Sequence, residues 1–167
     1  MSIAAGNKVP AAQLTVMGAN GPTPVSSTEL LGRGRIVLFS VPGPFTPTCS
    51  AQHLPGFLEH HPALVKRGID KVVCMAVSDI FVMDAWAKAS GVTDEVIMAA
   101  DGNGDFTAAL GLELDARAFG MGSRSQRFAL IIDAGVVTRV LVEESGAFRV
   151  SSAEYVLEQL DQAAGAA

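Results

Sequence analysis

The chain has few cysteines, few charged residues and no long hydrophobic run, and each shortage argues against a class of protein. Two cysteines in 167 residues are fewer than an extracellular disulfide framework uses, which favours a reducing compartment, and we expect the cytoplasm. Charged residues make up 17%, the net charge is −5, and no block of basic residues indicates a nucleic-acid or anionic-membrane surface. The apolar runs have the length of strands, short of the ~20 residues that span a bilayer.

The composition is that of a chain that buries a large core. Hydrophobic residues make up 49%, so we expect little disorder and a single domain over residues 1–167. The first eight residues lack a basic start followed by an apolar stretch, so no secretory signal is expected.

Apolar runs alternate with segments of helical character along the chain. We expect strands near 12–17, 36–41, 72–77, 96–100, 128–133 and 136–143, and helices near 26–29, 48–66, 80–89, 106–110 and 152–162. Pro55 should kink the helix 48–66 or shift its register, and Ala134-Gly135 should form a tight hairpin turn. Residues 111–122 are expected to be irregular. Strands alternating with helices, followed by a hairpin, predict an α/β fold with a central mixed sheet flanked by helices.

Cys49 is the candidate reactive residue. It follows the β-branched run 36–41 and a proline-rich loop, and it precedes a segment of helical character. We therefore expect the thiol in the first turn of a helix, where unpaired N–H groups and the helix dipole favour the thiolate, the nucleophilic form. The end of a central strand is also where active sites of open α/β sheets lie.

Several neighbouring residue types suit chemistry at this thiol. Thr46 offers a hydroxyl that could accept a hydrogen bond from a substrate or donate one to the thiolate. Pro42, with the other prolines of the loop, would stiffen it and shield the sulfur from water. A cation is expected from Arg124 or Arg127, and Arg127 directly precedes a strand, which would hold it rigidly.

The remaining thiol and imidazole groups leave alternatives open. His53 lies four residues after Cys49 and could be a general base, a metal ligand or a structural hydrogen-bonding residue; the last interpretation is favoured. No spacing of Cys and His predicts zinc, the turn 101–105 lacks the glutamate that would complete a calcium loop, and no dinucleotide fingerprint occurs. We therefore predict no metal and no cofactor. Cys74 lies within a predicted buried strand, and a bridge to Cys49 stays open.

The segment from Val41 to Phe57 resembles the active-site segment of the peroxiredoxins, and more narrowly the peroxiredoxin-5 (type II) subfamily. Its Pro-x-x-x-Thr-x-x-Cys core is Pro42, Thr46 and Cys49, and further similarity covers 77–83, 112–115 and 124–130. The resemblance extends from about residue 7 to residue 160. It implies a thioredoxin-like fold and the reduction of hydrogen peroxide and organic hydroperoxides.

The resemblance also implies roles for individual residues. Cys49 corresponds to the peroxidatic cysteine, Thr46 to the threonine that binds the peroxide, and Pro42 to the shielding proline. Arg127 corresponds to the arginine that contacts thiolate and peroxide, and Arg124 matches less closely. The chemistry agrees with the residue types, because a thiolate that attacks a peroxide oxygen becomes a sulfenic acid.

One departure from the family pattern bears on the reaction cycle. Some peroxiredoxins carry a resolving cysteine late in the chain, whereas residues 146–152 contain none here. We therefore expect a one-cysteine cycle in which glutathione, glutaredoxin or thioredoxin reduces Cys49. The resemblance further suggests a homodimer, with apolar contacts from Phe45 and the stretch 119–121.

Two other functions use the same thiol. A redox sensor would pass its oxidation to a partner protein and turn over slowly with peroxide. A thiol–disulfide oxidoreductase is disfavoured, because no second cysteine lies close to Cys49 in the sequence.

Overall fold

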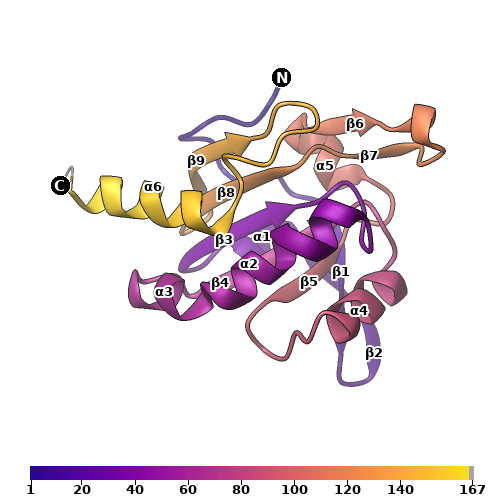
Figure 1. Cartoon of the computed structure of the whole chain (residues 1–167), viewed down its shortest axis with the longest axis horizontal. Coiled ribbons are helices and arrows are strands. Elements are labelled where there is room, and N and C mark those ends of the chain that lie inside the picture. The colour runs from indigo at the N-terminus through magenta and orange to yellow at the C-terminus, as the bar shows by residue number, and fades with distance from the viewer. Residues whose placement is uncertain (166–167) are drawn as a thin grey trace.

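A mixed seven-stranded sheet forms the centre of the molecule (Figure 1). The computed structural model describes residues 1–165. The strands lie in the order β2–β1–β5–β4–β3–β8–β9, and β6 and β7 form a separate antiparallel pair. Their bounds are β1 Gln13–Gly18, β2 Gly21–Ser26, β3 Arg35–Ser40, β4 Lys71–Ala76, β5 Ile97–Ala100, β6 Glu113–Asp115, β7 Ser123–Ser125, β8 Phe128–Asp133 and β9 Val136–Val142.

The three parallel strands β3, β4 and β5 lie at the middle of the sheet, and antiparallel strands complete both sides. Leu38 of β3 pairs with Val73 of β4 on one side and with Leu130 of β8 on the other. Such strands are buried on both faces, which explains why their sequences are continuously apolar.

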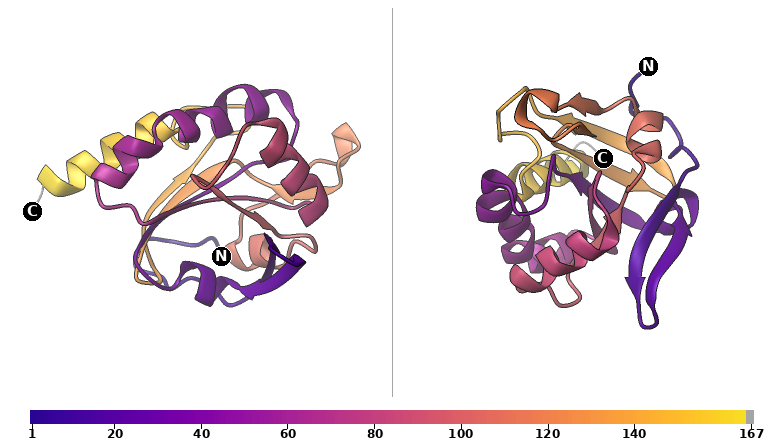
Figure 2. Two further views of the ribbon diagram at one scale, coloured as in Figure 1. Left: turned by 90° about the horizontal axis from the view of Figure 1, so that it is seen from below. Right: turned by 90° about the vertical axis from the view of Figure 1, so that its right-hand side faces the viewer.

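Helices cover both faces of the sheet (Figure 2). Helices α1 (Ser27–Leu31) and α5 (Asp105–Leu110) contribute to one buried cluster, while α2 (Leu54–Glu59), α3 (His61–Lys66), α4 (Ile80–Ala89) and α6 (Ala153–Gly165) contribute to the other. Alternate residues of β3 face opposite clusters, as Leu38 and Phe39 do. The predicted α/β architecture with a mixed sheet flanked by helices is confirmed.

The prediction of one helix over 48–66 is wrong. Cys49–His53 forms a turn of π-helix, in which the Leu54 N–H donates to the Cys49 carbonyl, and α2 and α3 are separate helices that meet at His60. Pro55 and Pro62 contribute, because a proline has no N–H to continue the bonding of the preceding helical turn. The π-turn directly before Pro55 is the shift of helical register that was predicted there. Pro55 lies in the first turn of α2, and Pro62 in that of α3.

Two other parts of the chain differ from expectation. Strand β2 contains Pro22 and Pro24 and lies at the edge of the sheet, the position where proline is tolerated. Residues 111–122, expected to be irregular, contain the short strand β6 and the 3₁₀ turn Arg117–Phe119, and β7 follows directly after them. None of the helices within residues 1–165 is long and apolar enough to cross a bilayer.

Candidate active site

Cys49 lies beyond the carboxyl end of β3, in the first turn of a helical segment that begins at residue 47. Its side chain is fully buried. The following residue, Ser50, accepts a hydrogen bond of 3.0 Å from the indole N–H of buried Trp86 in α4. The predicted placement of Cys49 at a strand-to-helix junction is therefore confirmed, and a second helix holds that junction in place.

Arg127 is brought to Cys49 by the pairing of β8 with β3. It precedes β8 directly, and its Nη2 donates to Cys49 Sγ over 3.1 Å. Its Nη1 lies 2.9 Å from His53 Nδ1. A guanidinium can only donate, so the sulfur is the acceptor, a role that a thiolate fills far better than a thiol.

The bonds around His53 define its tautomer. Because Nη1 of Arg127 donates to Nδ1, the ring proton lies on Nε2, which donates to the Ser151 carbonyl over 2.9 Å. Burial, followed by the charge of Arg127, lowers the pKa of His53 to about 3. The imidazole is therefore neutral with both nitrogens engaged, which favours the structural interpretation over a general base or a metal ligand.

Aromatic rings surround this arginine–histidine pair. The ring centroids of Phe39 and Phe148 lie 4.8 and 5.0 Å from that of His53. The Arg127 Cζ atom lies 5.8 Å from the centroid of Phe148, within the range of a cation–π contact. Phe148 was missed by the sequence analysis, although a lone phenylalanine in the polar loop after β9 is a signal that could have drawn attention to it.

Glu143 is a second residue that the sequence analysis missed. It directly follows β9 and is 8% exposed. Its carboxylate accepts hydrogen bonds from the N–H groups of Arg149, Val150 and Ser151 and from the Ser151 hydroxyl, all between 2.7 and 2.9 Å. Burial alone would raise the pKa of Glu143, but these hydrogen bonds outweigh it and the pKa is lowered. Nothing in the sequence marks a glutamate at a strand end as buried.

Thr46 and Pro42 flank the cysteine loop. The Thr46 hydroxyl donates to the Gly43 carbonyl over 2.6 Å, which leaves its lone pairs to accept from a bound molecule. The alternative in which Thr46 donates to the thiolate is not adopted. Gly43 leaves little room for a side chain, because an added Cβ would lie 3.0 Å from the terminal methyl group of Met121 and 3.2 Å from the methyl group of Thr46.

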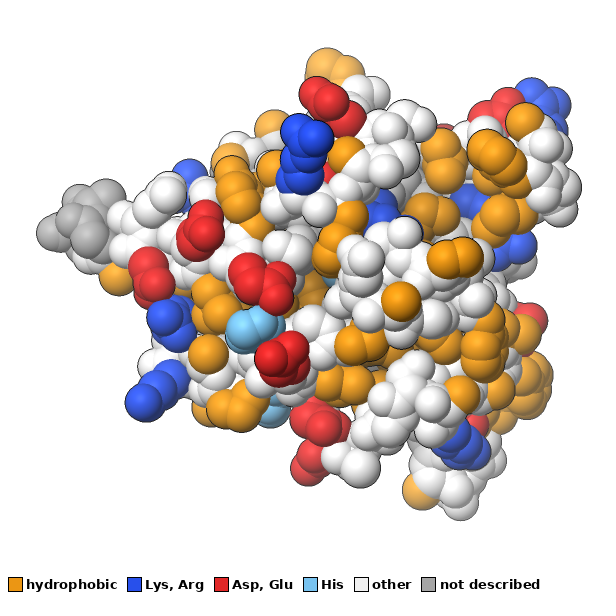
Figure 3. Space-filling model, viewed as in Figure 1, with side chains coloured by type: hydrophobic (Ala, Val, Ile, Leu, Met, Phe, Trp, Pro, Cys, Tyr) orange, Lys and Arg blue, Asp and Glu red, His pale blue; other side chains and the backbone are white. Residues whose placement is uncertain are grey.

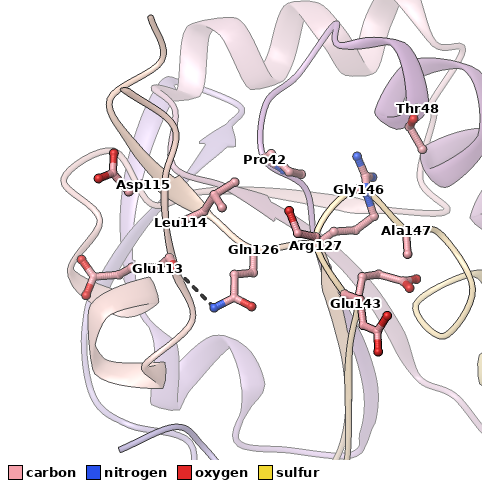
Figure 4. A pocket seen from close by; sticks show the side chains of 12 residues that line it. Pro42, Thr48, Glu113, Leu114, Asp115, Gln126, Arg127, Glu143, Gly146 and Ala147 are labelled. Carbon is pink, nitrogen blue, oxygen red and sulfur yellow. Dashed lines mark hydrogen bonds between the residues drawn. The ribbon is translucent and has the colours of Figure 1, made fainter. Parts of the chain in front are cut away.

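A cavity of about 250 Å³ adjoins the cysteine loop (Figure 4). Pro42, Thr48 and Arg127 form its side nearest Cys49, and Leu114 and Ala147 add apolar surface. The acidic residues Glu113, Asp115, Glu143 and Glu144 also belong to its lining. Cys49 itself is not exposed to the cavity, so a reactant reaches the sulfur only past these neighbours.

Arg124 does not reach the sulfur. Its Nε donates to the Met121 carbonyl over 2.8 Å and its Nη1 to the Val77 carbonyl over 3.2 Å, so it ties two loops together. Of the two candidate arginines, the one that precedes β8 is the one placed against Cys49.

Cys74 is a free, fully buried thiol in the middle of β4, and Cys49 is also free. Burial raises the pKa of Cys74 well above its ordinary value, and the neighbouring Cys49 adds to this rise. A thiol of this kind stays protonated and is a poor nucleophile. No three potential ligands among the His, Cys, Asp and Glu side chains of residues 1–165 are placed to hold a metal ion.

Comparisons with known proteins agree with this geometry. Residues 4–157 match the family model Redoxin. Peroxiredoxin-2E (chloroplastic) and peroxiredoxin-2B, both of Arabidopsis thaliana, are 45% and 44% identical; the matches cover 95% of this chain and 70% and 98% of the relatives. The crystal structure of reduced Prx3 in complex with hydrogen peroxide from Vibrio vulnificus is 45% identical, with a TM-score of 0.91, covering 95% of this chain and 99% of that one. The expected thioredoxin-like fold is confirmed, and the chain belongs to the peroxiredoxin family.

Proposed function

We propose that this peroxiredoxin reduces hydrogen peroxide and organic hydroperoxides through Cys49. The observation that carries the proposal is the 3.1 Å hydrogen bond from Arg127 to the buried Cys49 sulfur, next to a threonine with free lone pairs. The relative from Vibrio vulnificus, described in complex with hydrogen peroxide, supports the choice of substrate. Family membership favours peroxide turnover over a slow redox sensor.

In the proposed reaction, the Cys49 thiolate attacks one oxygen of the peroxide. An S–O bond forms while the O–O bond breaks, and the second oxygen leaves as alkoxide or hydroxide and takes up a proton. The sulfur loses two electrons to the peroxide and becomes a sulfenic acid. Thr46 accepts a hydrogen bond from the peroxide, Arg127 stabilises the charge that develops on its oxygens, and Pro42 keeps water from the sulfur.

The direct test is anaerobic stopped-flow mixing of the reduced protein with hydrogen peroxide. Wild type should be oxidised rapidly at one thiol, and Cys49→Ser should show no fast phase. A fast phase that survives in Cys49→Ser would assign the chemistry to another residue.

We further propose a one-cysteine cycle in which glutathione, glutaredoxin or thioredoxin reduces oxidised Cys49. The burial of Cys74 and its raised pKa support this cycle, because a protonated thiol inside the sheet cannot readily attack a sulfenic acid. Turnover of Cys74→Ser with each reductant is the test. Loss of turnover in a folded Cys74→Ser protein would contradict the proposal.

We also propose that the protein belongs to the peroxiredoxin-5 subfamily, is located in the cytoplasm and forms a homodimer. The resemblance of the longer segment, from Val41 to Phe57, is what supports the subfamily. Large apolar side chains remain exposed in the cysteine loop and in the turn after β6: Phe45 is 54% exposed and Phe119 81%. Figure 3 shows further hydrophobic side chains gathered over α4, where Phe81 is 66% exposed. Sedimentation of wild type and Phe119→Glu tests the dimer, which the glutamate should weaken.

A further inference from the structure

The carboxylate of Glu143 accepts hydrogen bonds from four donor groups of one loop. Three consecutive N–H groups, from Arg149 to Ser151, and one hydroxyl all point at it. A concave run of backbone N–H groups closed on an anion in this way is a rigid unit. The backbone of Glu143 is itself fixed to the site, because its N–H donates to the Arg127 carbonyl over 3.0 Å.

The loop held by Glu143 supplies two groups that contact the arginine–histidine pair. The Ser151 carbonyl accepts the Nε2–H of His53, and the Phe148 ring lies against both His53 and Arg127. A continuous set of contacts therefore runs from the Glu143 carboxylate through Ser151 and His53 to Arg127 and the Cys49 sulfur.

We propose that Glu143 is a positioning residue for the peroxidatic centre. Its hydrogen bonds with residues 149–151 fix the Ser151 carbonyl, and this carbonyl holds His53 in the tautomer and orientation that place Arg127 against Cys49. The inference rests on the function proposed above and extends it to a residue outside the reacting groups.

The physical reason lies in the two tautomers of the imidazole. While the Ser151 carbonyl is in place, the ring proton is held on Nε2 and Nδ1 is free to accept from Arg127. If that carbonyl moves away, the Nδ1–H tautomer becomes available, and its N–H would face the N–H of the guanidinium. Arg127 would then lose one of its two anchors, and its bond to the sulfur would weaken.

The test compares Glu143→Gln with Glu144→Gln. Glutamine is close to isosteric, but it has one acceptor oxygen instead of two and presents an NH₂ donor to the N–H groups of the loop. The thiolate of Cys49 is titrated by its ultraviolet absorbance, with Cys49→Ser subtracted for the background from Cys74. If Glu143 positions Arg127, the midpoint of this titration should rise by about one pH unit in Glu143→Gln, a tenfold change in the thiolate equilibrium.

The direction of the shift separates positioning from simple charge. Removing a negative charge near the sulfur favours the thiolate and lowers the midpoint, whereas loss of Arg127 from its place raises it. Glu144 lines the same cavity but is exposed, and its carboxylate makes none of the loop contacts. Its glutamine variant should therefore show a small shift to lower pH. An unchanged or lowered midpoint in folded Glu143→Gln would overturn the proposal.

A milder variant covers the case in which Glu143→Gln fails to fold. Ser151→Ala removes the hydroxyl donor to Glu143 and keeps the carbonyl that binds His53. It should raise the midpoint by a smaller amount, and no rise would overturn the proposal. Both titrations are performed without peroxide, so they remain informative even if the stopped-flow experiment contradicts the peroxidase function.

Discussion

Two separate anchors hold the guanidinium of Arg127. Nη1 donates a hydrogen bond to the neutral imidazole of His53 and Nη2 donates one to the Cys49 sulfur, while the guanidinium carbon lies 5.8 Å from the centroid of the Phe148 ring. A planar fork with donors in fixed directions meets both acceptors without rearrangement, so the charge is in place before a peroxide arrives. This preorganisation depends on the shape of arginine as much as on its charge.

Arg127→Lys is therefore expected to slow oxidation of Cys49 severely. A lysine ammonium can approach the sulfur or His53, but it cannot reproduce both bonds, and we expect the rate constant with hydrogen peroxide to fall about 100-fold. Stopped-flow mixing measures it. Arg33→Lys is the matched control, because Arg33 is exposed in the turn between α1 and β3. A wild-type rate in Arg127→Lys would refute the role of Arg127.

For single residues, the sequence predicted those that react with or contact the peroxide, but not the residues that hold them in position. Cys49, Thr46 and Pro42 belong to one short segment, and Arg127 is marked by the strand that follows it. Phe148 and Ser151 contact His53 only after β9 and its following loop have packed against the cysteine segment. No local pattern encodes these contacts, because the partners lie far apart along the chain, as the 98-residue separation of His53 and Ser151 shows. The Glu143 carboxylate binds residues only six to eight positions later, but the loop must already be folded for their N–H groups to converge on it.

At the scale of elements, the hairpin between β8 and β9 contains a strained residue. Ala134 has a φ of +49° and Gly135 a φ of +82°, the left-handed conformation that a two-residue hairpin turn needs at both positions. Glycine adopts it freely, whereas the Cβ of alanine is crowded there. The predicted turn is confirmed, and its first position is occupied by a residue that suits it poorly.

Ala134→Asn should stabilise the protein by about 0.5–1 kcal/mol, because asparagine tolerates this conformation and Asn-Gly is a favoured hairpin sequence. Urea unfolding followed by circular dichroism measures the change. Ala118→Asn is the control: it is also exposed, but its φ is not positive, so it should gain nothing. An equal gain at both positions would mean that relief of strain is not the cause.

The elements that were predicted well are those with a strong local pattern. The helix Ile80–Ala89 has a capping aspartate, Asp79, whose side chain accepts from the Val82 N–H, and its bounds match the expectation. The short strands β6 and β7 lack such a pattern: Glu113 and Asp115 are exposed, and only Leu114 between them is partly buried. They form because the chain on either side is already fixed, which sequence periodicity does not report.

For the molecule as a whole, His53 couples stability to pH. Its pKa is 6.5 in the unfolded chain and about 3 when folded, so between these values the unfolded state binds the extra proton. The stabilisation is fully present above pH 6.5 and is lost as the pH falls towards 3. The expected slope is at most about 1.4 kcal/mol per pH unit.

Urea unfolding of wild type and His53→Gln between pH 7 and about pH 5 measures this slope where most carboxyl groups stay ionised. Wild type should lose stability over this range more steeply than the variant. Comparing slopes removes the contributions of His60 and His61, which both proteins share. Parallel curves would contradict the assignment of a neutral, buried imidazole.

The two prolines of β2 affect how copies of this protein meet. Pro22 and Pro24 pair with Met17 and Thr15 on the inner side, so the N–H groups they lack are those that would point outward from the sheet edge. A strand from another molecule would find two consecutive donors missing and could not extend the sheet there. At high concentration, this edge therefore resists the strand-to-strand stacking that leads to aggregation.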